Sequence, residues 1–106
     1  MSGSKIIIAE GDRLDNVHPG DILREDFLIG TDLSLAEVAR GTGIPVDTLA
    51  AVVARRREVD ASVDARLTRY LRMSEGFFLR LQNDYDLEEV HRTEGDALDR
   101  IVPRAA

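Results

Sequence analysis

The sequence SLAEVARGTGIPVDTLAAVVA, which spans residues 34–54, decides the fold of this chain. Ser34 and Glu37 have the spacing of a capping box, in which a hydroxyl and a carboxylate satisfy free backbone N–H groups at the start of a helix. Counted from Leu35, small or apolar residues stand at positions 4, 5, 10, 15 and 18, and a glycine stands at position 9. These residues are Val38, Ala39, Ile44, Leu49, Val52 and Gly43.

This spacing predicts two short helices that cross steeply around a tight turn. Helices that cross in this way approach closely at one point, where Ala39 is small enough to fit. Gly43 suits the turn because glycine adopts a left-handed backbone conformation without a clash at Cβ. The remaining apolar residues face other helices and hold the pair rigid. We therefore predict a helix-turn-helix, with an αα-corner that does not contact DNA as the alternative.

Further helices are expected on both sides of this motif. Pro19 and Asp21 begin a first helix that ends at Gly30, because proline suits the first helical turn and a carboxylate suits the positive end of the helix dipole. Apolar residues recur at helical spacing over residues 61–73 and again from residue 74 onwards. The sequence thus predicts an all-α fold with five helices.

The composition restricts the class of protein. The chain has no cysteine, which excludes disulfides, thiolate metal sites and cysteine nucleophiles. No apolar run reaches the roughly 18 residues of a transmembrane helix, and residues 6–8 are too short an apolar run for a signal peptide. His18 and His91 lack metal-ligand spacing, and no catalytic motif stands out. We expect a cytoplasmic protein that is not an enzyme and has no metal, cofactor or membrane partner.

The net charge of −6 is unevenly distributed along the chain. Residues 1–30 carry −3, residues 31–80 carry +1 and residues 81–106 carry −4. The middle of the chain can therefore face DNA phosphates, while the acidic ends suit a basic partner protein. Solubility alone is the competing explanation for the acidic ends.

The DNA-binding surface is predicted at the third helix and the segments beside it. The exposed side of this helix offers small apolar contacts for thymine methyl groups but few donors for base edges. Arginines follow the helix, so the sequence predicts binding to the DNA backbone more than reading of its bases. DNA affinity should depend mainly on these arginines. The predicted DNA-binding residues are Ser34, Val46, Asp47, Thr48, Ala50, Ala51, Arg55, Arg56 and Arg57.

A second apolar cluster lies near the start of the expected fifth helix. It contains Phe77, Phe78, Leu81 and Tyr85, and it offers more apolar surface than a core near the end of the chain needs. We predict that this cluster forms a homodimer interface. A two-fold dimer would place two third helices about 34–36 Å apart, which matches successive major grooves.

Three segments of the chain resemble the HigA-type antitoxins of addiction modules. They read HPGDILRE at residues 18–25, LSLAEVA at residues 33–39 and LQNDYDL at residues 81–87. The resemblance implies a five-helix Cro/cI-like (lambda-repressor-like) helix-turn-helix domain that is usually a homodimer. It also implies that the protein binds operator DNA, represses its own operon and neutralises a small, basic, RelE-like ribonuclease toxin.

The chain departs from the family pattern at two places. Leu35 stands where the family usually has a glutamine that can bind a phosphate, and three arginines replace the family's usual polar loop after the third helix. Two alternatives therefore remain. One is a protein-interaction module that kept the fold but lost specific DNA binding, and the other is a stand-alone transcription factor without a toxin.

Three parts are expected along the chain. Residues 1–16 form an N-terminal arm, in which residues 5–10 suit a short strand because they include β-branched residues. Residues 17–92 form the helix-turn-helix domain, and residues 93–106 form an acidic tail with a helical extension. Residues 6–8 are expected to become ordered when the toxin binds, because three adjacent β-branched apolar residues are poorly placed in solvent.

Overall fold

A computed structural model describes residues 16–105 of the chain, and these residues contain only helices and loops. Their order is α1 (Pro19–Ile22), the π-helical segment η2 (Leu23–Ile29), α2 (Leu35–Thr42), α3 (Val46–Val53), α4 (Ala61–Leu71) and α5 (Phe77–Asp99). The prediction of an all-α fold with five α-helices is confirmed for this part of the chain. The strand suggested for residues 5–10 lies outside the described residues, as does the predicted arm except for Asn16.

The first helix begins as the sequence predicts. His18 is its N-cap: the Nδ1 atom accepts a hydrogen bond of 2.9 Å from the backbone N–H of Gly20, and the Asp21 carboxylate accepts one of 3.0 Å from the N–H of His18. After one turn the chain widens into η2, which ends at Gly30 with a hydrogen bond from its N–H to the Glu25 carbonyl. The expected single helix is therefore an α-helical turn followed by a π-helical segment.

The helix-turn-helix has the predicted geometry. Ser34 and Glu37 form the capping box of α2, with hydrogen bonds of 2.9 and 3.1 Å in the two directions. Gly43 ends α2 in the left-handed conformation, with φ 76°. The Thr42 hydroxyl accepts a hydrogen bond from the N–H of Ile44 and donates one to the carbonyl of Val38. These bonds satisfy polar groups that the tight turn would otherwise leave unpaired.

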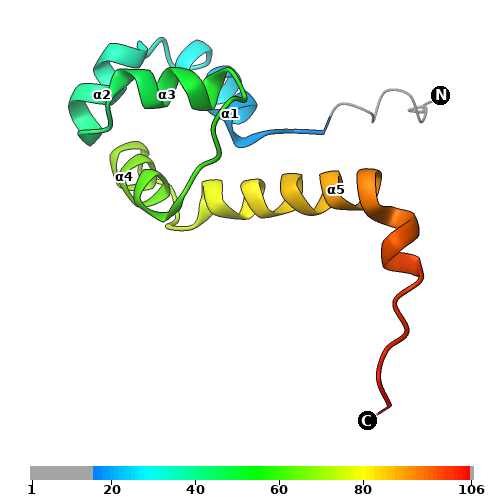
Figure 1. Ribbon diagram of the computed structural model, residues 1–106. Helices are drawn as coiled ribbons and strands as arrows, with labels where there is room; N and C mark the ends of the chain where they lie inside the picture. The colour runs from blue at the N-terminus through cyan, green and yellow to red at the C-terminus, as the bar shows by residue number, and fades with distance from the viewer. Residues whose placement is uncertain (1–15, 106) are drawn as a thin grey trace, which may run out of the picture.

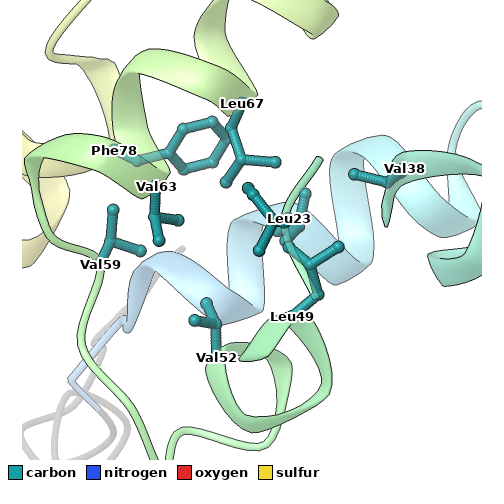
Figure 2. Packing of buried hydrophobic residues seen from close by; sticks show 9 residues of the cluster. Leu23, Val38, Leu49, Val52, Val59, Val63, Leu67 and Phe78 are labelled. Carbon is teal, nitrogen blue, oxygen red and sulfur yellow. The ribbon is translucent and has the colours of Figure 1, made fainter. Parts of the chain in front are cut away.

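The core lies where α1, η2, α2, α3, α4 and the start of α5 meet (Figure 1). Figure 2 shows Leu23 near the middle of this cluster, between Leu49 of α3 and Leu67 of α4. Burial of an aliphatic side chain contributes about 1.5–3 kcal/mol, so this cluster supplies much of the stability. The buried apolar residues are Leu23, Val38, Ile44, Leu49, Val52, Val59, Val63, Leu67 and Phe78.

The last two helices depart from the sequence prediction at their ends. α4 stops at Leu71 because Arg72 takes a left-handed conformation, with φ 61°. α5 starts at Phe77 rather than at residue 74 or 75, because Gly76 has φ 94° and lies outside the helix. α5 then runs to Asp99, through the boundary predicted between residues 92 and 93.

The second half of α5 stands away from the core (Figure 1). The radius of gyration of 17.0 Å is larger than the roughly 13 Å of a compact domain of this length. Much of the surface of α5 is therefore open to a partner. Among the described residues, no helix is long and apolar enough to cross a membrane.

Candidate nucleic-acid interface

The exposed side of α3 is the centre of the predicted DNA surface. Leu49 and Val52 are fully buried, which fixes the opposite side of the helix toward solvent. Val46 is 46% exposed and Asp47 is also exposed, whereas Thr48, Ala50 and Ala51 are half-buried. The hydroxyl of Thr48 is the single uncharged hydrogen-bonding side chain in this helix. The exposed side of α3 is therefore rich in methyl groups and poor in hydrogen-bond donors.

The start of α2 contributes Ser34, the predicted DNA-binding residue that lies outside α3 and the arginines after it. Ser34 is exposed, and its hydroxyl oxygen accepts the capping hydrogen bond from the backbone N–H of Glu37. The Glu37 carboxylate accepts hydrogen bonds from the backbone N–H and the hydroxyl of Ser34. These bonds hold the pKa of Glu37 below its usual value, so this residue stays a carboxylate. Leu35 packs against the core instead of facing solvent. The start of α2 therefore presents a hydroxyl and a carboxylate, whereas the segment after α3 presents arginines.

The three arginines that follow α3 have different environments. All three are exposed, and Arg57 lies 3.8 Å from the carboxylate of Asp60. Arg55 instead forms a bidentate pair with Asp21, at 2.6 and 3.0 Å, and also donates to the carbonyl of Asn16 at 2.8 Å. The sequence placed all three arginines in one phosphate-binding cluster. The structure separates Arg55 from the other two.

A groove beside the turn contains residues that the sequence prediction missed. Arg57, Ser62 and Arg66 line it together with Thr48 and the turn residues Gly43 to Pro45. Arg66 also donates a hydrogen bond of 2.9 Å to the carbonyl of Thr42, at the end of α2. Arg66 lies in α4, more than 20 residues from the turn, so no local pattern in the sequence points to this contact.

The predicted dimer cluster divides into buried and half-buried residues. Phe78 is 0% exposed and contacts Phe27 and Phe77, so its side chain packs within its own protomer, and its role in a dimer stays a prediction. Phe77 and Leu81 are half-buried and pack against the same core. The ring of Tyr85 lies edge-on to that of His18, with centroids 4.9 Å apart. These residues mainly anchor α5 to its own protomer.

Polar contacts complete the attachment of α5. Gln82 is 5% exposed; its amide oxygen accepts a hydrogen bond of 2.8 Å from the N–H of Val59, and its amide nitrogen donates to Asp86 at 3.0 Å. Asn16 donates to the carbonyl of Tyr85 at 2.8 Å and to Glu89 at 3.2 Å. Within residues 16–105, no group of three or more histidine and acidic side chains is arranged to hold a metal ion.

The capped, glycine-ended α2 and the α3 that crosses it define a helix-turn-helix protein of the kind that presents one helix to the DNA major groove. The Pseudomonas aeruginosa antitoxin HigA, solved with the higBA promoter, is 33% identical over 86% of this chain and 100% of its own, with a TM-score of 0.79. The chain belongs to the HigA family of antitoxins.

The chain is also similar to two further proteins. PA4674 of Pseudomonas aeruginosa, solved with an 18-bp operator DNA, is 33% identical over 88% of this chain and 99% of its own, with a TM-score of 0.81. A virulence-associated protein I from Dichelobacter nodosus is 29% identical over 82% of this chain and 80% of its own length. No family model matches the sequence.

Proposed function

We propose that this chain binds operator DNA and acts as the antitoxin and autorepressor of a toxin-antitoxin module. One observation carries the proposal: the whole helix-turn-helix is preserved in a chain that is 33% identical to operator-bound PA4674. In this arrangement α3 enters the major groove, and the segments at its two ends reach the phosphates on either side.

The side chains divide the work of binding. Arg56, Arg57 and the Ser34 hydroxyl bind phosphates, which gives affinity without sequence information. The methyl groups of Val46, Ala50 and Ala51 suit thymine methyl groups, and Asp47 can accept a hydrogen bond from a cytosine amino group. Thr48 can bond to several bases. With so few donors, we expect a modest ratio of specific to non-specific affinity.

The experiment is a fluorescence-anisotropy titration of the chain with the DNA upstream of its own gene, at several salt concentrations. We expect the R56A/R57A variant to bind more weakly, with a slope of log K against log salt that is shallower by about 0.9 for each lost phosphate contact. The matched control is R100A/R104A, which removes the same charge from exposed residues after α5. An equal loss in both variants would contradict the proposed surface.

The proposed partner protein is a small basic ribonuclease toxin of the RelE-like kind. Residues 81–106 carry −4, and the exposed surface of α5 holds most of these carboxylates, among them Asp84, Asp86 and Glu88. Opposite charge mainly speeds association, while buried apolar contacts set the lifetime of a complex. We expect association with the co-encoded toxin to slow as salt rises, while dissociation changes less, in surface plasmon resonance.

A protein-interaction module without operator recognition is the second candidate. The donor-poor surface of α3 favours it, because a reader of base edges normally carries arginine, asparagine or glutamine there. Competition with unrelated DNA separates the two functions. An autorepressor keeps the upstream DNA bound in the presence of excess unrelated duplex. A module that lost recognition binds the two DNAs equally well, so the excess duplex displaces the upstream DNA.

A further inference from the structure

Arg55 has an unusual backbone conformation for its position. It follows the C-cap residue of α3, Ala54, and it has φ 65°, in the left-handed region that favours glycine. An L-residue with a long side chain holds this conformation only when the surrounding structure compensates for its cost. The side chain of Arg55 supplies that compensation.

Among the described residues, the guanidinium of Arg55 is held on three acceptor atoms. Its Nε donates to Asp21 Oδ1 at 3.0 Å, and its Nη2 donates both to Asp21 Oδ2 at 2.6 Å and to the carbonyl of Asn16 at 2.8 Å. Asp21 is itself fixed, because its carboxylate caps α1 through the N–H of His18. The hydrogen bond with Arg55 lowers the pKa of Asp21, so the pair stays charged at neutral pH.

The C-terminal end of α3 contacts two other elements. The backbone of Gly20, in α1, lies so close to α3 that a Cβ atom there would fall 1.9 Å from the carbonyl oxygen of Val52. Asn16, which accepts from Arg55, donates in turn to the carbonyl of Tyr85 and to Glu89 in α5. The C-terminal end of α3 is thus tied to α1 directly and to α5 through Asn16.

We propose that Arg55 is a positioning residue for DNA binding and not a phosphate contact. It holds the left-handed turn that immediately precedes Arg56 and Arg57, and the side chains of both are exposed. A bidentate arginine-carboxylate pair has a fixed geometry, so it suits this structural role. The inference rests on the proposed function, because it assigns a role within the same DNA-binding surface.

The test compares salt titrations of DNA binding for single variants. R55A should weaken binding about tenfold and leave the slope of log K against log salt unchanged, since no phosphate contact is lost. R56A should make the slope shallower by about 0.9. R55G should recover part of the affinity lost in R55A, because glycine adopts a positive φ without strain. Circular dichroism and thermal melts establish that each variant is folded at the assay temperature.

The variant D21N gives a second test, because the two possible roles of Asp21 predict opposite changes in DNA affinity. Removal of a negative charge beside a DNA surface should strengthen binding by electrostatics alone. If Asp21 holds Arg55 in place, D21N instead weakens binding, and the double variant R55A/D21N is no weaker than R55A because the two residues act as one unit.

Two results would overturn the inference. A shallower salt slope in R55A, equal to that of R56A, would make Arg55 a phosphate contact, and stronger binding by D21N would remove its link to Asp21. Both require that the wild-type chain binds DNA. Failure of the wild-type chain to bind its upstream DNA would overturn the proposed function, and this inference with it.

Discussion

The carboxylate of Asp64, in α4, accepts a hydrogen bond of 2.8 Å from the backbone N–H of Phe78, in the first turn of α5. It also accepts from the N–H groups of Gly76 at 2.7 Å and Leu79 at 3.2 Å, and it is 1% exposed. Gly76 offers no side chain that could cap α5. Asp64 therefore caps a neighbouring helix and fixes the angle between α4 and α5.

Substitution of Asp64 should be costly for stability. D64N keeps one acceptor oxygen but loses the charge and the second oxygen, so we expect it to lower the free energy of unfolding by about 1.5–3 kcal/mol, the value of a hydrogen bond to a charged group. Urea denaturation followed by circular dichroism measures this change. D84N is the matched control on exposed α5 surface, and it should change stability by less than about 0.5 kcal/mol. Equal stability of the two variants would contradict the capping role.

His18 should make the stability of the protein depend on pH. It is 3% exposed, and its burial, opposed by the nearby carboxylates of Asp21 and Asp86, lowers its pKa below 6.5. The unfolded chain therefore takes up a proton at a higher pH than the native protein does. The contribution of neutral His18 to the free energy of unfolding is complete above about pH 6.5. It is lost as the pH falls toward the pKa of His18 in the folded protein, by at most about 1.4 kcal/mol per pH unit.

The variant H18N isolates this effect. Asparagine also caps a helix but does not titrate, so ionisable groups shared by the two proteins cancel in the comparison. Between pH 6.5 and 5, the free energy of unfolding should fall more steeply for the wild-type protein than for H18N. Parallel curves over this range would show that the imidazole is not responsible.

Two glycine-to-alanine substitutions should have opposite effects. In G20A the new Cβ atom would fall 1.9 Å from the carbonyl oxygen of Val52, and backbone atoms cannot move aside cheaply. Overpacking of this kind costs about 1–3 kcal/mol or more. In G95A, within α5, the new Cβ atom meets no atom within 4 Å. Since alanine favours a helix interior, G95A should stabilise the protein by about 0.5–1 kcal/mol. Thermal melts at matched concentration measure both changes.

Much of the fold was predictable because its signals are local. Ser34 and Glu37 are three residues apart, and Gly43 directly follows the helix that it ends, so spacing alone placed α2 and its turn. The start of α5 was not predictable in the same way. It is set by Asp64, whose role depends on how α4 and α5 pack, and no short-range pattern records that packing.

The sequence predicted which residues of α3 are accessible in the candidate interface, but not which side chains contact one another. The exposed and half-buried residues of α3 follow from helical periodicity once Leu49 and Val52 are assigned to the core. The role of Arg55 could not be read from three adjacent arginines, because its partner Asp21 stands 34 residues earlier in the chain. The burial of Phe78 could not be read from the sequence either, because an aromatic pair at the start of a helix does not reveal which ring enters the core.

The outer face of α5 is the part of the molecule best placed for the proposed homodimer. Leu87 is 60% exposed, and Val90 and Leu98 follow at a spacing that keeps all three on one side of the helix. We expect two copies of the chain to pair along this stripe, because a two-fold contact between projecting helices would remove these large apolar side chains from water.

The variant L87E tests this arrangement directly. A carboxylate in place of the most exposed residue of the stripe would be buried at the proposed contact, so we expect a dimer for the wild-type chain and a monomer for L87E in light scattering at micromolar concentration. V102E is the matched control, because Val102 is 84% exposed and lies beyond the end of α5. L87E should also bind operator DNA more weakly and with a shallower salt slope, since a monomer occupies one half-site. A wild-type monomer, or a dimer that survives L87E but not V102E, would place the interface elsewhere.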